Sequence, residues 1–340
     1  MIRMLHGADL HLDSPFSSFA PQERAEYRQL QRELPGKLAR LANAADCQLL
    51  LLSGDVFDSE EVHPKTLQAL QEAFMIFRGR VFISPGNHDP YTEQSVWAQI
   101  AWPENVHVFK TAYECVTIEE LGCCVHGGAF LEQICMEPIR SAQDDDYIHI
   151  GVYHGEVSAE SPYRAITKEQ IRHSGLNYLA LGHIHKRSFP QKLGKTWYGW
   201  PGVTMSRGFD EPGQCGALLV SLQKGNCTAE FLPIENPTYE TLTVPGGTAP
   251  EIPKGSDRIH CRMRFVGSSQ PIDREKILKT YGDQFLSLDV IDETTPLQDV
   301  WQWCEDSTLR GIALAWLRQQ PDGEFAAQYL LAALEGGEEP

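Results

Sequence analysis

Short apolar runs recur along the first 235 residues, and polar residues close each of them. The runs are rich in leucine, isoleucine and valine, which favours buried β-strands. We expect early strands over residues 2–6, 48–53, 81–84, 147–154 and 178–182. Helical spacing of apolar residues predicts helices over 37–45 and 64–77, the second with Pro64 in its first turn. This alternation of strands and helices predicts an α/β domain.

Three later runs, over residues 197–200, 217–221 and 228–232, follow one another without a long helix between them. Parallel strands need a long crossover connection, whereas antiparallel strands do not. The later strands therefore predict a mixed sheet architecture instead of a purely parallel one.

A stretch rich in proline and glycine, over residues 245–250, marks a linker. After it, apolar and polar residues alternate over 260–265, a helix is expected over 274–281 and a strand over 285–291. Further on, Leu309 and Trp316 lie on one apolar face of a predicted helix, and 325–334 predict another. We expect a main domain over 1–240, a small β-α-β module over 255–296, and a short acidic helical tail over 297–340.

Composition limits the class of protein. The chain has 340 residues, of which 42% are apolar, and this suffices for a large core. No apolar stretch is long enough for a membrane segment, and the start of the chain has no leader pattern. The nine cysteines are scattered and form no CxxC pair, so we expect reduced thiols and a cytoplasmic protein.

The formal net charge of −17 favours solubility and opposes nonspecific attraction to nucleic acid. Any polyanionic substrate would therefore need local positive charge on the protein. Lys186, Arg187 and Arg207 flank the polar motifs described next, and two interpretations stay open for them: contact with phosphates, or solvated surface charge.

Residue types that bind metals recur where the predicted strands end. They are Asp9 and His11, Asp55 and Asp58, Asn87 to Asp89, His154, and His183 with His185. Because ligands of an open α/β sheet gather outside one end of its strands, residues distant in sequence can converge there. We expect these five groups to form one site.

The spacing of the pairs suggests how the donors are presented. In an extended segment residues i and i+2 point the same way, so Asp9 with His11 and His183 with His185 each offer two donors. With Asp55, Asn87 and His154 there are seven candidate donors, more than one tetrahedral zinc ion takes. Two divalent metals sharing a carboxylate account for them. Mn²⁺ is expected first, while Fe²⁺ and Zn²⁺ stay open.

The stretch Ser84 to Pro90, SPGNHDP, suggests a division of labour. Our hypothesis is that Asn87 is a metal ligand and that His88 instead faces the phosphate, where it stabilises the transition state or protonates the leaving oxygen. Asp89 would hold His88 and fix its tautomer. Two cations about 3.5 to 4 Å apart can clamp a phosphate for in-line displacement, so the pattern predicts phosphoester hydrolysis.

The five motifs, in the order D-x-H, G-D-x-x-D, G-N-H-D, a lone H and G-H-x-H, resemble those of the calcineurin-like metallophosphoesterases. The resemblance covers about the first 235 residues and implies a four-layer α/β/β/α sandwich. It also implies the metal ligands: Asp9, His11 and His185 for one ion, Asn87, His154 and His183 for the other, and Asp55 between them. His88 takes the catalytic role.

Within that superfamily the chain is similar to the DNA-repair exonuclease branch, the SbcD and YhaO-like proteins. The similarity is carried by ADLHLDSPF, LLLSGDVFD, GLNYLALGHIHKR and RGFDEPGQCG. It implies a metal-dependent DNA exonuclease or endonuclease, a capping module after the nuclease domain, an SbcC-like coiled-coil ATPase partner, and a homodimer.

Two other functions stay open. The same site would serve a small-molecule or nucleotide phosphodiesterase or phosphatase, and the charge of −17 suits a small substrate better than a duplex. A non-catalytic regulatory subunit is the third. At the residue level, Asp58 either orients a ligand or caps a helix, and His6, His126 and His149 are expected to be core histidines.

Overall fold

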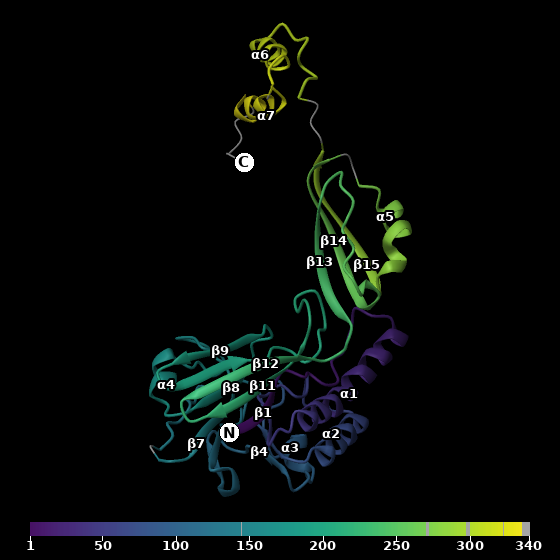
Figure 1. Ribbon diagram of the computed structural model, residues 1–340. Helices are drawn as coiled ribbons and strands as arrows, with labels where there is room; N and C mark the ends of the chain where they lie inside the picture. Colours follow the sequence, from purple (N-terminus) through teal and green to yellow (C-terminus); the bar gives the residue numbers. More distant parts are fainter. Residues whose placement is uncertain (144, 270–271, 297–299, 322, 335–340) are drawn as a thin grey trace. The chain divides into compact units, whose positions relative to one another are not determined.

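The computed structural model describes residues 1–143, 145–269, 272–296, 300–321 and 323–334 (Figure 1). The chain divides into two compact units. The first consists of Met1–Thr241 with Gly255–Cys261 and Gln284–Ser287, and the second of Leu242–Lys254, Arg262–Asp283 and Leu288–Pro340. The three-part division predicted above stays a prediction.

One six-stranded sheet of the first unit has the order β12-β11-β1-β2-β3-β4. Its strands are β12 (Asn226–Pro233), β11 (Gly216–Gln223), β1 (Ile2–Gly7), β2 (Leu49–Leu52), β3 (Arg80–Ile83) and β4 (Val106–Val108). Strands β1 to β4 are parallel, whereas β11 runs antiparallel to both β1 and β12. The predicted strands at these places are confirmed, but β4 was missed because it is only three residues long.

The other six-stranded sheet has the order β5-β6-β7-β8-β10-β9. Its strands are β5 (Glu114–Ile118), β6 (Cys123–Gly128), β7 (Ile148–His154), β8 (Tyr178–Gly182), β10 (Thr196–Trp200) and β9 (Ser188–Leu193). The four central strands are parallel and the two edge strands pair antiparallel to their neighbours. The predicted mixed architecture is confirmed. Sequence reasoning missed β5, β6 and β9, whose polar and cysteine residues weaken the apolar signal.

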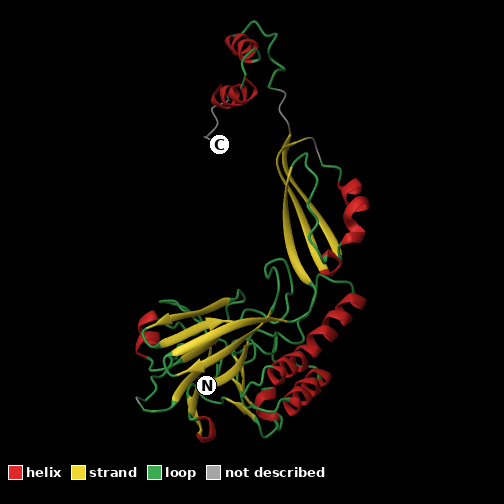
Figure 2. Ribbon diagram, in the orientation of Figure 1, coloured by secondary structure: helices red, strands yellow, loops and turns green. Residues whose placement is uncertain are grey.

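Helices cover both outer faces of the two sheets, which Figure 2 shows in yellow between red helices. They are α1 (Pro21–Ala44), α2 (Pro64–Ile76), the short α3 (Val96–Gln99) and α4 (Lys168–His173), with a 3₁₀ turn over Glu119–Leu121. One apolar core lies between α1, α2 and the first sheet, a second lies between the sheets, and a third lies under α4. The predicted four-layer α/β/β/α sandwich is confirmed.

Helix α1 is much longer than predicted, because the expected helix over 37–45 is only its last third. Pro35 lies inside it, and a proline in a helix interior removes a hydrogen bond and costs roughly 3 kcal/mol, so the sequence suggested a start after it. Tyr27, Leu34 and Leu38 are buried on one face of the helix, and this packing outweighs the cost.

The C-terminal part contains a three-stranded sheet of order β13-β14-β15. Its elements are β13 (Thr238–Pro245), β14 (Ile259–Ser269), α5 (Arg274–Tyr281) and β15 (Ser287–Pro296), with 3₁₀ turns over Ser256–Arg258 and Gly282–Gln284. The predicted β-α-β order is present as β14-α5-β15, but β13 was missed because it runs into the proline-rich linker. Helices α6 (Leu309–Leu317) and α7 (Gly323–Leu334) follow, and they pack together through Leu314, Ala327 and Leu331. Among the described residues no helix combines the length and the apolar character needed to cross a membrane.

Candidate metal centre

The five predicted groups all lie at the carboxyl ends of parallel strands. Asp9 follows β1, Asp55 follows β2, Asn87 follows β3, His154 is the last residue of β7, and His183 follows β8. The segment after β1 is held beside the segment after β2 by backbone hydrogen bonds, from the N–H of Asp9 to the carbonyl of Gly54 and from that of His11 to Asp55. This pairing brings the first two groups together.

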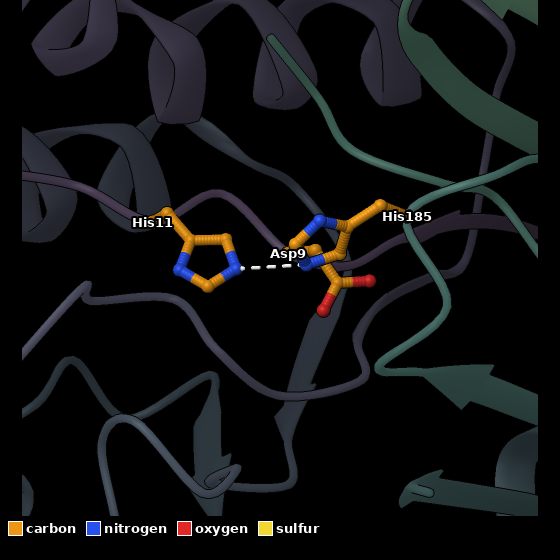
Figure 3. Close-up of side chains that lie close together, drawn as sticks. All are labelled: Asp9, His11 and His185. Atoms are coloured by element: carbon orange, nitrogen blue, oxygen red, sulfur yellow. Dashed lines mark hydrogen bonds between the residues drawn. The ribbon is translucent and has the colours of Figure 1, made fainter. Parts of the chain in front are cut away.

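Asp9, His11 and His185 form one cluster, in which a ligand atom of each lies within 4.8 Å of the others (Figure 3). The Nε2 atoms of the two imidazoles face each other at 3.2 Å. Both Asp9 and His11 are buried. Three donors from two different loops thus meet at one point.

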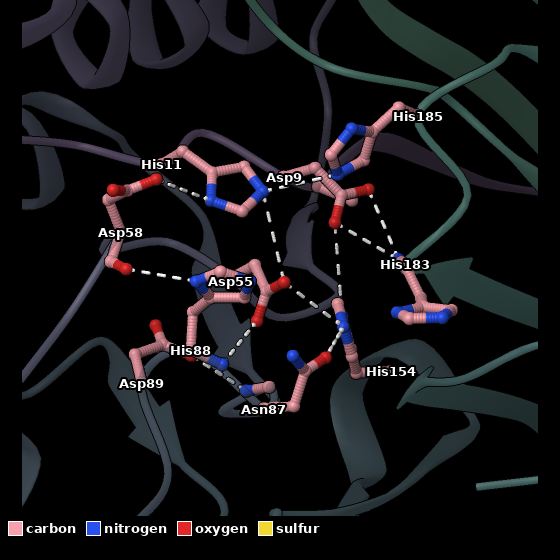
Figure 4. A network of polar contacts seen from close by, with 12 residues as sticks. Asp9, His11, Asp55, Asp58, Asn87, His88, Asp89, His154, His183 and His185 are labelled. Atoms are coloured by element: carbon pink, nitrogen blue, oxygen red, sulfur yellow. Dashed lines mark hydrogen bonds and ion pairs between the residues drawn. The ribbon is translucent and has the colours of Figure 1, made fainter. Parts of the chain in front are cut away.

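Asp55, Asn87 and His154 form a second cluster beside the first (Figure 4). The Nε2 atom of His154 lies 2.9 Å from Asn87 Oδ1 and 3.3 Å from Asp55 Oδ2. The same Asp55 oxygen lies 3.8 Å from His11 Nε2, so this carboxylate stands between the clusters. The backbone supports the arrangement at Gly86, where a side chain would collide with the Asp55 carboxylate.

Each imidazole of the two clusters is oriented by a contact of its Nδ1 atom with an oxygen atom outside the cluster. Nδ1 of His154 donates to the carbonyl of Ser53 at 2.9 Å, and Nδ1 of His11 lies 3.1 Å from Asp58 Oδ1. Nδ1 of His185 lies 2.8 Å from Glu211 Oε1. All three rings therefore turn Nε2 toward the cluster, which is how metal-binding histidines are oriented. Asp58 orients the ring of His11, and the helix-cap interpretation is wrong, because His63 is the N-cap residue of α2.

Sequence reasoning missed Glu211, and it missed the ion pairs of Arg207. The guanidinium of Arg207 donates to Glu211 Oε1 at 2.6 Å and to Asp58 Oδ1 at 3.0 Å, so it is not a solvated surface charge, and its contact with phosphate stays a prediction. Burial opposes ionisation of Glu211, but His185 and Arg207 lower its pKa to about 2. The only signal in the sequence was that both residues fall in RGFDEPGQCG.

His88 and Asp89 do not form the predicted pair. Nδ1 of His88 lies 2.9 Å from the backbone carbonyl of Asp58, and its ring is exposed beside the clusters. The Asp89 carboxylate is buried and accepts the backbone N–H groups of Gly86, Val56 and Phe57 at 2.7 to 3.1 Å. Within the described residues it makes no hydrogen bond to His88. Asp89 fixes the loops after β2 and β3, and the backbone orients His88.

The imidazole of His183 is not brought into either cluster. Its backbone N–H donates to both Asp9 carboxylate oxygens, at 3.0 and 3.2 Å, while its ring lies against those of His154 and Tyr163 (Figure 4). Burial and the neighbouring His154 lower the pKa of His183 to about 4. Its role as a ligand stays a prediction.

The premise of extended segments is also wrong. Asp9, His11 and His183 have φ angles of 50°, 44° and 90°, in the left-handed half of backbone space that costs a non-glycine residue free energy. Asp9 and His11, at positions i and i+2, both reach the site because of these left-handed conformations. For His183 the turn directs the backbone, not the ring, to the cluster.

The donor set fits two divalent cations. The Asp9 and Asp55 carboxylates are almost fully buried, and buried charge must be compensated. Burial opposes protonation of His154, but Asp55 raises the pKa of that imidazole to about 9, so a proton supplies part of the compensation. Cations between the facing donor atoms would replace that proton.

Comparison with known proteins agrees with this geometry. Residues 2–187 match the model of the calcineurin-like phosphoesterases. The chain belongs to this family. Calcineurin-like phosphoesterases use a dinuclear metal site, and the two clusters provide candidate ligands for it.

The calcineurin-like chain is 30% identical, over 260 residues, to the uncharacterized metallophosphoesterase YhaO of Bacillus subtilis (strain 168). That match covers 72% of this chain and 63% of YhaO, which is less than two thirds of the relative's length. The similarity to a solved structure of protein TT1561 of Thermus thermophilus has a TM-score of 0.43 and 12% identity, and it covers 68% of this chain and 98% of that one. The similarity to a solved structure of an archaeal phosphodiesterase has a TM-score of 0.40 and 14% identity, and it covers 68% of this chain and 100% of that one.

A pocket of about 730 Å³ opens beside His88 and Asn87. Its wall carries the carboxylates of Asp58, Glu60 and Glu61 and the side chains of Gln133, Ile134 and Tyr163. A second pocket, of about 470 Å³, is lined in part by His185, Lys186 and Arg187. The Arg187 guanidinium lies 3.6 Å from the centre of the Phe231 ring, so part of its charge faces an aromatic ring.

Proposed function

We propose that this calcineurin-like phosphoesterase is a dinuclear-metal phosphodiesterase that cleaves the phosphodiester bonds of DNA, with Mn²⁺ as its preferred ion. The observation that supports phosphodiester hydrolysis is that six candidate metal donors converge, with the exposed imidazole of His88 beside them. The donors are Asp9, His11, Asp55, Asn87, His154 and His185.

The metal ions would neutralise phosphate charge and activate water for attack. Asp55 lies where it would serve both ions, and Asn87 adds a neutral donor. The ring of His88 is exposed, and it is not one of the donors in the cluster of Asp55, Asn87 and His154. Because its Nδ1 atom donates to the Asp58 carbonyl, Nε2 is the nitrogen available to a substrate, and the imidazolium form of the ring would donate its Nε2 proton to the leaving oxygen.

Similarity to the SbcD and YhaO-like branch supports DNA as the substrate, and with it a role in DNA repair in the cytoplasm. The same similarity supports an SbcC-like ATPase partner and a homodimer. Helix α6 offers a surface for such a partner, because Leu309, Ile312 and Trp316 are 87%, 64% and 62% exposed. Exposed apolar residues on one helical face are typical of a protein interface.

The lining of the larger pocket favours a second candidate, a small phosphodiester such as a nucleotide derivative. The carboxylates of Glu60 and Glu61 border the position beside His88, and each would repel the neighbouring phosphates of a polyanion. A substrate with a single phosphodiester avoids that repulsion, and Tyr163 and Ile134 offer it apolar contacts.

One experiment tests the reaction and separates the substrates. Wild type, His88→Ala and Asp55→Ala are assayed with Mn²⁺ on a 5′-labelled DNA hairpin and on bis(p-nitrophenyl) phosphate, with metal content measured in parallel. Wild type should cleave both substrates. His88→Ala should keep its metals and lose roughly 10² to 10⁴-fold in rate, as expected for a general acid. Asp55→Ala should lose metal.

Hydrolysis of the small diester without any cleavage of DNA, alone or with an SbcC-like ATPase, would remove the DNA proposal and leave the small-diester function. A wild-type protein that binds two metals and hydrolyses neither substrate would contradict phosphodiesterase activity altogether.

A further inference from the structure

The loop between β1 and α1 contains several residues in left-handed backbone conformation. Four of them are not glycine, and their φ angles are 50° at Asp9, 44° at His11, 65° at Asp13 and 46° at Phe16. This conformation costs an ordinary residue free energy, and it persists only where surrounding contacts hold it. Asp9 and His11 are also candidate metal ligands. The contacts that hold this loop therefore determine where two donors of the metal centre lie.

One buried side chain of α1 is bonded directly to this loop. Gln31 is 0% exposed. Its Nε2 atom donates to the backbone carbonyl of His11 at 2.8 Å, and its Oε1 atom accepts the backbone N–H of Ser14 at 3.2 Å. A buried amide needs such partners, because burial without hydrogen bonds is costly. The side chain of Gln31 and the turn from His11 to Ser14 therefore stabilise each other.

The hydroxyl of Ser14 connects this contact to the ring of His11. It lies 2.6 Å from the His11 carbonyl oxygen and 3.1 Å from Asp58 Oδ1. The same Asp58 oxygen lies 3.1 Å from Nδ1 of His11. One connected set of polar groups thus contacts both the backbone and the imidazole of this candidate ligand.

Neighbouring side chains of α1 contact other parts of the loop. Arg28 and Arg32 share a helix face with Gln31, because Arg28 lies three positions before Gln31 and four before Arg32. Nε of Arg28 donates to the carbonyl of Ser14 at 3.3 Å, and the guanidinium of Arg32 lies 3.5 Å from the Asp13 carboxylate. Of these three side chains, Gln31 is the one bonded to a candidate metal ligand.

We propose that Gln31, together with Ser14, is a positioning residue for the metal ligand His11. The amide holds the His11 carbonyl, so the strained backbone persists and Nε2 of the ring stays turned toward Asp9 and His185. A donor that is already oriented loses less conformational freedom when it binds an ion, and this raises the affinity. The inference rests on the metal centre and does not depend on which substrate is hydrolysed.

Gln31→Met tests this role. Methionine has a similar length but makes neither hydrogen bond. The N–H of Ser14 also donates to the His11 carbonyl at 3.2 Å, so both backbone groups keep a partner and the variant should fold. The metal-free full chain is titrated with Mn²⁺ in a calorimeter. We expect the affinity for the ion at His11 to fall roughly 10 to 100-fold, and the affinity for the other ion to stay unchanged.

Two further variants separate positioning from general destabilisation. His11→Ala identifies the binding step that involves His11, and adding Gln31→Met to it should cause little further loss of affinity, because Gln31 acts through His11. Gln48→Met is the matched control. The Gln48 amide also bonds two backbone groups, the N–H of Arg3 and the carbonyl of Asp46, near the amino ends of β1 and β2. This control should lower stability to urea and leave metal affinity unchanged.

Unchanged affinity for both ions in Gln31→Met would overturn the proposal. An equal loss of affinity in Gln48→Met, or a full further loss in the His11→Ala background, would also overturn it, since Gln31 would then act through the stability of the fold. If Gln31→Met does not fold, Ser14→Ala, which removes the hydroxyl contacts with His11 and Asp58, should lower the same affinity, and an unchanged affinity there would contradict the proposal.

The wild-type titration keeps this inference apart from the proposed function. A wild type that takes up no Mn²⁺ would overturn the positioning role, because His11 would then have no ion to bind. Hydrolysis is not measured in the titration. A protein that binds two ions with the expected pattern among the variants but cleaves no phosphodiester would therefore contradict the proposed function and support the role of Gln31.

Discussion

Individual side chains of the metal centre differ in which way they face. Asp9, Asp55 and the Nε2 atoms of the histidines face the clusters, whereas Asp58 and Glu211 hold two of those histidines from behind. Arg207 lies between these two outer carboxylates and compensates their charge. The inner groups would bind the metals, and the outer ones set the direction in which the rings point.

The role of Glu211 can be tested by Glu211→Gln. The amide removes the carboxylate charge next to His185 Nδ1 and one acceptor of Arg207, so the ring is less firmly oriented. We expect metal affinity at the cluster of Asp9, His11 and His185 to fall roughly 10 to 100-fold. Metal titration followed by calorimetry measures this.

The matched control for that change is Asp210→Asn, which neutralises the adjacent but exposed carboxylate. It should leave metal affinity unchanged. Equal losses in both variants would show that general negative charge, and not the contact with His185, supports binding.

Asp89 gives a second residue-level prediction. Asp89→Ala leaves three buried backbone N–H groups without their acceptor, so we expect a loss of roughly 3 kcal/mol in the free energy of unfolding. It should also lower metal content, unlike His88→Ala. Urea unfolding and metal analysis of both variants check this. If Asp89→Ala kept full stability and metal content but lost activity, Asp89 would act through His88 as the sequence first suggested.

Elements of the fold determine where the site forms. Strands β1, β2 and β3 belong to one sheet and β7 and β8 to the other, and all five end at the metal centre. The centre therefore forms only when the two sheets are packed against each other in the correct alignment. His6 in β1 contributes to this, because its Nδ1 atom lies 2.9 Å from the Tyr178 hydroxyl and its Nε2 atom 3.2 Å from the Leu181 carbonyl, both in β8.

His6 makes the contact between the sheets sensitive to acid. Burial lowers its pKa from the usual 6.5 to about 3, so between these values the unfolded chain binds a proton that the folded protein does not. Stability must fall as the pH falls through this window. From pH 7 to pH 5 the expected loss is about 2 kcal/mol from this group.

Urea unfolding of wild type and His6→Gln at pH 7 and pH 5 measures that contribution. The variant should be less stable at pH 7, since it loses the inter-sheet contacts, but its stability should change less between the two pH values. An identical pH dependence in both proteins would show that other groups cause the acid sensitivity.

At the scale of the whole molecule, every predicted ligand belongs to the first unit, whereas α6 and α7 belong to the second. A chain that lacks residues 301–340 should therefore bind the same two metals and hydrolyse bis(p-nitrophenyl) phosphate at the wild-type rate. If α6 binds an ATPase partner, the shortened chain should no longer co-purify with it. Loss of diester turnover in the shortened chain would show that the C-terminal helices support the site.

The charge of the molecule bears on the choice of substrate. A formal charge of −17 and the carboxylates of Glu60 and Glu61 near His88 both oppose the approach of a polyanion. A DNA substrate would therefore depend on its partner or on bound metal ions for attraction. A small diester needs neither.

The sequence by itself determined the family motifs, the α/β class and six converging donors, because those depend on local spacing and on strands that end at a common edge. It missed β4, β5, β6, β9 and β13, and it began α1 after Pro35 instead of at Pro21, since pairing with neighbouring strands and packing of the helix decided those elements and neither is visible in local propensity.

Only the tertiary structure decided which groups meet from distant segments. Glu211 is 26 residues after His185 in the sequence, and Asp89 is 33 residues after Val56, so no spacing rule pairs them. Left-handed backbone at Asp9, His11 and His183 replaced the expected extended geometry and directed the His183 ring away from the clusters. The packing of two sheets against each other fixed these contacts, because it positions every loop at the shared strand ends.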